Sequence, residues 1–278
     1  MRPTGKNLSI IINELNVSYH DEGPDDAPVI IFIHGFPLNK NTWNSQIDGL
    51  KSTYRVIAYD IRGHGDSDSG PNDFSINLFA NDLNLFLDTL QIEKAVVCGL
   101  SMGGYIALTA VSRPKHRFQG LILADTQCTA DTPEGKEKRK KSIESIHAYG
   151  VAQYADESIK HFFAAASYEN KKEAVAEIRN MIMKTTRTSI SNTLHALAER
   201  RDTCRYLVEF KIPVLFLVGE EDSITPPAAS QFMKSKILKS TLRIIENAGH
   251  LSNIENPEAF NQHIRTFMEK IFSPVEVE

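Results

Sequence analysis

Six short apolar runs recur along the chain, and each ends at a glycine, a histidine or an acidic residue. Most of them lack polar alternation and are rich in β-branched residues, as strands are when both faces of a parallel sheet are covered. The pattern therefore predicts six buried strands. They cover residues 29–33, 55–59, 95–98, 121–124, 214–218 and 242–245.

Between these runs, apolar residues recur at spacings of three and four, which is typical of helices packed on one face. Residues 75–90 show this pattern, and a last helix is expected to begin at Asn256 and Pro257. Residues 8–19 resemble an antiparallel pair at the sheet edge. The alternation predicts an α/β fold with a doubly wound, mostly parallel, eight-stranded sheet.

One long interval interrupts this rhythm, because residues 127–186 contain no strand-like run. Helical stretches are expected instead at 136–149, 151–166 and 171–184. We predict a helical cap over 127–186, inserted into a core formed by residues 1–126 and 187–278.

Composition limits the possible functions. The 278 residues are 41% hydrophobic and 24% charged, which suits a globular protein with a large core. The net charge of −4 gives no reason to expect nucleic acid or an anionic membrane as a partner. No stretch is long and apolar enough to span a bilayer. Nothing in the pattern indicates an oligomeric state.

The three cysteines match no zinc site or redox pair, so Cys98, Cys128 and Cys204 are expected to be reduced, structural thiols. The first seven residues lead into no apolar segment, so no signal peptide is expected. Together these observations favour a cytoplasmic protein. The sequence has no metal-ligand cluster and no dinucleotide glycine fingerprint, so neither a metal nor a cofactor is expected.

A candidate nucleophile follows the third apolar run. Gly99, Ser101 and Gly103 form G-x-S-x-G between a predicted strand and a predicted helix. The turn is so tight that larger side chains at 99 and 103 would clash. Such a turn projects the serine hydroxyl into the cleft beyond the strand ends.

Acyl transfer also needs two donors aimed at the developing oxyanion. One candidate is the backbone N–H of Met102, directly after the serine. The other is the N–H of Phe36, in the loop after the first apolar run, because Pro37 has no N–H.

A base and an acid complete the set. Asp222 follows the fifth apolar run and His250 follows the sixth, which gives the order Ser101, Asp222, His250. A histidine near neutrality can take the serine proton, and a buried carboxylate can orient it.

Other residues could take these roles. Glu220 and Glu221 adjoin Asp222, and Asp125 lies at another strand end. His34 and His64 sit in glycine-containing loops, where we expect them to order the chain.

Together, H-G-F-P at 34–37, D-I-R-G-H-G-D-S at 60–67, G-L-S-M-G-G at 99–104, G-E-E-D at 219–222 and N-A-G-H at 247–250 resemble the α/β-hydrolase superfamily. The resemblance extends from about residue 29 to the end of the chain, and capped esterases and enol-lactone hydrolases look most similar. It implies a serine hydrolase that cleaves an ester or lactone of a small molecule through an acyl-enzyme.

Several alternatives share the same residues. They are a C–C bond hydrolase, a cofactor-free haloperoxidase or perhydrolase, a ligand receptor on this fold, and an inactive scaffold. The basic run at 136–141 is expected to be a solvated helix face, although an acidic substrate could use it.

Overall fold

The protein is built on one sheet of eight strands in the order β1-β2-β4-β3-β5-β6-β7-β8. The computed structural model describes residues 2–71, 73–112 and 117–273. Strand β2 pairs antiparallel with both neighbours, and the other pairings are parallel. The strands are β1 (Gly5–Ile12), β2 (Leu15–Glu22), β3 (Val29–Ile33), β4 (Arg55–Tyr59), β5 (Ala95–Leu100), β6 (Phe118–Ala124), β7 (Val214–Gly219) and β8 (Ser240–Ile245). The predicted fold class is confirmed.

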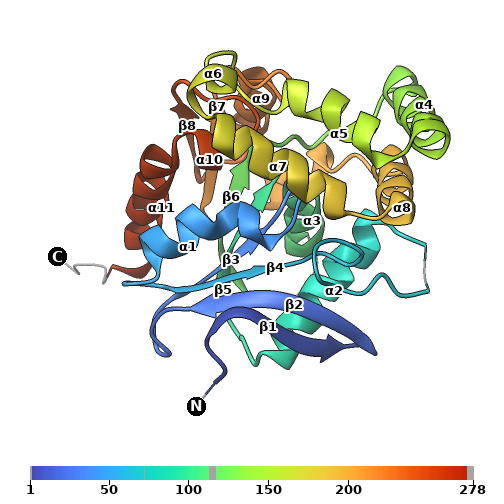
Figure 1. The fold of residues 1–278 in the computed structure, drawn as a ribbon. Coiled ribbons are helices and arrows are strands. Elements are labelled where there is room, and N and C mark those ends of the chain that lie inside the picture. The colour runs from blue at the N-terminus through green and yellow to red at the C-terminus, as the bar shows by residue number, and fades with distance from the viewer. Residues whose placement is uncertain (1, 72, 113–116, 274–278) are drawn as a thin grey trace.

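Both faces of the sheet are covered, which explains the uninterrupted apolar runs. Along β3, Ile31 and Ile33 pack into one apolar cluster, while Ile30 and Phe32 pack into another on the opposite face. The first face carries α2 (Ile76–Thr89), α3 (Met102–Val111) and α9 (Pro227–Lys236). The second face carries α1 (Asn44–Leu50), α10 (Ser252–Glu255) and α11 (Pro257–Phe272) (Figure 1).

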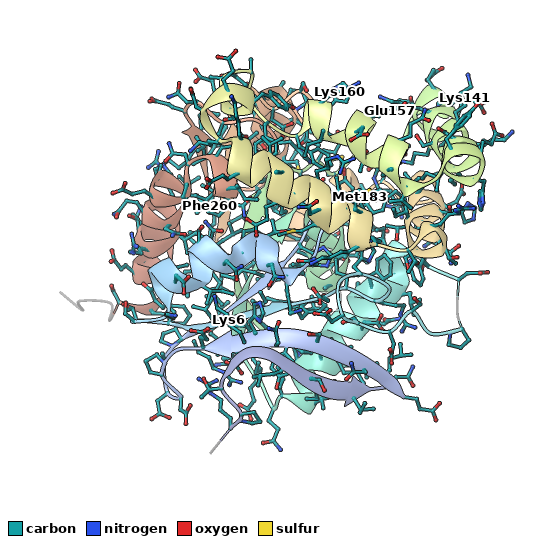
Figure 2. The ribbon with its side chains drawn as sticks, in the orientation of Figure 1. Lys6, Lys141, Glu157, Lys160, Met183 and Phe260 are labelled. Atoms are coloured by element: carbon teal, nitrogen blue, oxygen red, sulfur yellow. A yellow bond between two sulfur atoms is a disulfide. The ribbon has the colours of Figure 1, made fainter. Side chains whose placement is uncertain are left out.

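The last helix begins where the sequence indicates. The side chain of Asn256 accepts a hydrogen bond from the N–H of Ala259, and Pro257 occupies the first turn. Phe260 on α11 is fully buried near Trp43, the single tryptophan, between α11 and α1 (Figure 2). This helix therefore closes the second face.

Between β6 and β7 the chain forms only helices, which lie over one end of the sheet (Figure 1). Short 3₁₀ turns occur at Ile159–His161 and Cys204–Glu209. The α-helices are α4 (Pro133–Tyr149), α5 (Val151–Ser158), α6 (Ser167–Asn170), α7 (Lys172–Lys184) and α8 (Arg187–Ala198). The absence of strands from 127–186 agrees with the sequence pattern. Helix α8 packs on α4 through Ile146, Ile190 and Leu194.

The expected state of the cysteines is wrong in one respect. Cys128 and Cys204 form a disulfide, and only Cys98, a buried residue of β5, is free. The two residues are separated by 76 positions, so no local pattern indicates the pairing, but the fold brings their Cα atoms within 4.9 Å. The disulfide removes one observation on which the cytoplasmic expectation rested.

Candidate active site

The turn after β5 holds Ser101 in an unusual backbone conformation. Its φ is 51° and its ψ is −112°, a region that residues with a side chain rarely adopt. A Cβ at Gly99 would lie 2.2 Å from the carbonyl oxygen of Gly103, and one at Gly103 would lie 2.2 Å from that of Ile33. Glycine is therefore required at both positions, as predicted, because Gly99 lies against the first turn of α3 and Gly103 lies against the end of β3.

Three predicted residues from three strand ends form one hydrogen-bonded chain. Nε2 of His250 lies 2.9 Å from Oγ of Ser101, and Nδ1 of His250 lies 2.9 Å from Oδ2 of Asp222. The side chains of His250 and Asp222 are only 4% and 0% exposed. Since an ionised carboxylate can only accept, Nδ1–H donates to Asp222 and Nε2 is left to accept the serine proton.

Thr225 hydrogen-bonds to the carboxylate of Asp222, and this role was not predicted from the sequence. Its hydroxyl donates to Oδ2 of Asp222 at 2.7 Å, and its N–H donates to Oδ1 at 3.0 Å. Burial opposes ionisation of Asp222, but His250 and these donors outweigh burial and lower the pKa of the carboxyl. The spacing Asp-x-x-Thr could have indicated this turn.

The rival acids occupy other positions. Asp125 accepts hydrogen bonds from the N–H of Gly219 and the hydroxyl of Ser252. Burial and the charge of Asp222 raise the pKa of Asp125 well above its ordinary value. Glu220 and Glu221 are exposed, and each accepts from a backbone N–H group, that of Asn247 and that of Ala165 respectively. Of these carboxylates, only Asp222 hydrogen-bonds to His250.

Both predicted oxyanion donors flank the serine. Met102 is the first residue of α3, where a backbone N–H has no intrahelical acceptor. The loop containing Phe36 is close, since a Cβ at Gly35 would lie 3.4 Å from Cβ of Ser101. Within the described ranges, neither N–H has an acceptor in the protein. Both groups are therefore available to a ligand oxygen near Ser101.

Two other histidines order the surrounding loops. Nε2 of His34 accepts from the N–H of Ile61, so its Nδ1–H donates to the carbonyl oxygen of Gly35. His64 is buried beside His34, with ring centroids 5.4 Å apart, and donates through Nδ1 to the carbonyl oxygen of Arg62. Burial lowers the pKa of both rings, that of His64 to about 4. The predicted ordering role agrees with these contacts.

A cavity of about 470 Å³ opens in front of Ser101. Its inner wall is apolar, and its outer rim, made by α4 and α5, carries both charge signs. The apolar lining residues are Phe36, Met102, Tyr105, Tyr154, Phe162, Leu194, Leu197 and Ile224. A small organic molecule therefore fits with its apolar part against the inner wall.

The basic run on α4 divides between solvent and cavity. Lys138 and Arg139 line the cavity rim, whereas Lys141 points outward at the edge of the helical layer (Figure 2). Arg139 pairs with Asp131, which also lines the cavity. The expected solvated face is thus only part of the arrangement. With Glu157 also at the rim, the cavity carries balanced charge.

Two kinds of feature are absent from the described part of the chain. It contains no group of three or more His, Cys, Asp or Glu side chains placed to hold a metal ion. No helix among residues 2–71, 73–112 and 117–273 has the length and apolar character needed to cross a membrane.

Comparison with known proteins identifies the family of this chain. A family model described as the alpha/beta hydrolase fold matches residues 28–257. A 3-oxoadipate enol-lactonase of Acinetobacter baylyi is 34% identical over 96% of this chain and 95% of its own length.

Solved structures of an esterase and an enol-lactonase are also similar to this chain. A thermophilic esterase from Thermogutta terrifontis aligns with a TM-score of 0.90 and 32% identity, covering 96% of this chain and 99% of the esterase. An enol-lactonase from Burkholderia xenovorans aligns with a TM-score of 0.87 and 26% identity, covering 94% and 99%. The chain belongs to the α/β-hydrolase fold family.

Proposed function

We propose that this protein is a serine hydrolase that cleaves an ester or lactone bond of a small molecule through an acyl-enzyme intermediate. The observation that carries the proposal is the hydrogen-bonded chain from Ser101 through His250 to Asp222, in which Ser101 and His250 line the cavity. A serine hydroxyl needs such a base to become a nucleophile.

In the proposed reaction, Oγ of Ser101 attacks the carbonyl carbon while Nε2 of His250 takes the proton. The charge of Asp222 stabilises the resulting imidazolium. The oxygen of the tetrahedral intermediate accepts from the N–H groups of Phe36 and Met102, and the N-terminus of α3 adds partial positive charge. His250 then protonates the leaving oxygen. In the second half of the reaction water attacks the acyl carbon, His250 takes a proton from that water, and the proton returns to Oγ of Ser101 as the acid is released.

Three features support the ester or lactone class. Relatives of known activity are an enol-lactonase and an esterase, each aligned over nearly the whole chain. The apolar inner wall suits the acyl part of such a substrate. The lining includes two cations, Lys138 and Arg139, and two carboxylates, Asp131 and Glu157, so this balanced charge is compatible with an uncharged ester or lactone.

Replacing Ser101 with alanine tests the proposal. We expect Ser101→Ala to remain folded and to lose about 10³-fold or more in kcat on a small activated ester, because the three groups act as a unit. A fluorophosphonate probe should label the wild-type protein at Ser101 alone.

Ser112→Ala provides a matched control, because Ser112 is the C-cap at the opposite end of α3 and its exposed hydroxyl donates to the carbonyl oxygen of Thr109. This variant should keep wild-type turnover and labelling. A folded Ser101→Ala protein with near-normal hydrolysis would rule out the proposed nucleophile. Absence of ester or lactone turnover by the wild type would favour a receptor.

A further inference from the structure

Glu255 is a buried carboxylate that the proposed reaction does not use. It ends the short helix α10, five residues after His250, and is only 3% exposed. Among the described residues it forms no ion pair with lysine or arginine. Burying a charge in this way is costly unless strong hydrogen bonds compensate. Its contacts must therefore provide that compensation.

The two carboxylate oxygens bind two different segments of the chain. Oε1 accepts from the N–H of Gly249 at 2.6 Å, and Oε2 accepts from the N–H of Ala164 at 2.8 Å. Gly249 directly precedes His250, whereas Ala164 belongs to the helical layer between β6 and β7. Charge-assisted bonds of this kind are short and strong. Glu255 thus joins the histidine loop to the layer above it.

Other close contacts join the histidine loop to residues 162–164. The N–H of Leu251 donates to the carbonyl oxygen of Phe162 at 3.1 Å, and the Phe162 ring lies 6.1 Å from that of His250. A Cβ at Gly249 would lie 2.6 Å from the backbone nitrogen of Ala164. The loop carrying His250 therefore has its backbone pressed against residues 162–164.

We propose that Glu255 is a positioning residue for His250, which holds the histidine loop against residues 162–164 so that Nε2 stays within reach of Ser101. This inference rests on the proposed function. A carboxylate suits the position because both of its oxygens accept. Glutamine would set an NH₂ group against one of the two N–H groups. The hydrogen bond to either Gly249 or Ala164 would then be lost, and Glu255 would no longer join the histidine loop to residues 162–164.

The test is Glu255→Gln, measured on a small activated ester. We expect kcat to fall about 10- to 100-fold with KM changed less than about twofold, because a misplacement of about 1 Å at a reacting group has an effect of this size. The labelling rate of Ser101 by a fluorophosphonate should fall by the same factor. A residue that only stabilised the fold would not change labelling at temperatures where the variant is fully folded.

Asn253→Ala is the matched control. Asn253 lies on the same helix, is also buried, and donates to the carbonyl oxygen of Thr42 and the side chain of Gln46, away from the histidine loop. It should lose stability but keep kcat and the labelling rate. If Glu255→Gln fails to fold, Glu255→Asp, whose shorter side chain cannot reach both N–H groups, is measured in its place.

Two results would overturn the inference. One is a folded Glu255 variant with wild-type kcat and labelling. The other is an equal loss in Asn253→Ala, which would assign the effect to packing of α10. Failure of the proposed function itself is distinguishable, because then either the wild type would show no turnover or Ser101→Ala would retain activity, whatever residue stands at 255.

Discussion

Individual buried polar residues around the site are satisfied by specific partners, and these partners explain their presence. Lys40 and Asp60 are both fully buried and lie 2.8 Å apart through Nζ and Oδ2. Asp60 also accepts from the backbone N–H groups of Lys40 and Asp66. The pair fixes the loop after β4 against the segment after β3, which carries Phe36.

Removing the Lys40 ammonium should destabilise the fold strongly. Lys40→Met should lower the free energy of unfolding by about 3–5 kcal/mol at neutral pH, because it leaves the Asp60 carboxylate buried without its partner. Chemical denaturation measures the change. Lys6→Met, which removes an exposed ion pair to Asp48, should change stability by less than about 1 kcal/mol. Equal effects of the two variants would contradict the assignment.

Histidine burial predicts how stability depends on pH. Because burial lowers the pKa of His64 to about 4, the unfolded chain binds a proton near pH 6.5 that the folded chain does not. Stability from this group is complete above pH 6.5 and is lost as pH falls toward 4. His64→Asn should reduce the loss between pH 7 and pH 4.5 by about 2–3 kcal/mol. Urea unfolding at both pH values tests this, and an unchanged pH dependence would refute it.

At the scale of elements, strand ends bring the chemistry together. Ser101 follows β5, Asp222 follows β7 and His250 follows β8, and parallel strands present their carboxyl ends at one edge. The helical layer covers that edge (Figure 1). Its large apolar side chains divide by position, because Tyr154 and Phe162 line the cavity while Phe163, Ile178 and Met181 pack among other apolar residues.

This division predicts which substitutions change substrate preference. Tyr154→Ala and Phe162→Ala should change the ratio of kcat/KM between long and short acyl esters about tenfold, since each removes apolar contact with the acyl chain. Met183→Ala is the control, because Met183 is 40% exposed and lies outside the cavity (Figure 2). Kinetics on a graded ester series measure the ratio. A wild-type ratio in both cavity variants would place acyl selection elsewhere.

For the molecule as a whole, one covalent link spans the helical layer. The Cys128–Cys204 disulfide joins the chain just after β6 to the segment after α8, and the N–H of Thr203 donates to the carbonyl oxygen of Cys128 beside it. The disulfide therefore holds together the two ends of the segment that contains α4 to α8.

Loss of this link should act mainly on the unfolded chain. Cys204→Ser should lower the free energy of unfolding by about 2–5 kcal/mol, because a long loop is no longer closed in the unfolded state. A thiol reductant should produce a similar decrease in the wild type and none in the variant. Equal sensitivity of both proteins to reductant would show that the link does not contribute to stability.

Much of the site could be predicted because its residues follow local patterns. The turn at Gly99 and Gly103 needs glycine for steric reasons that five residues express. The order of Ser101, Asp222 and His250 follows from strand ends that the apolar runs mark. The support that Thr225 gives to Asp222, and the place of Lys138 at the cavity rim, were not predicted, because they depend on loops whose course the local pattern does not encode.

By itself, the sequence determined the fold class, the strands of the parallel sheet and the glycine turn around Ser101, since burial periodicity and steric demands are local properties of the chain. Only the tertiary structure decided which distant groups meet. The Cys128–Cys204 disulfide, the Lys40–Asp60 pair and the contact of Glu255 with residues 162–164 all join segments far apart in sequence. Such pairs depend on how whole elements pack, and no local pattern records that packing.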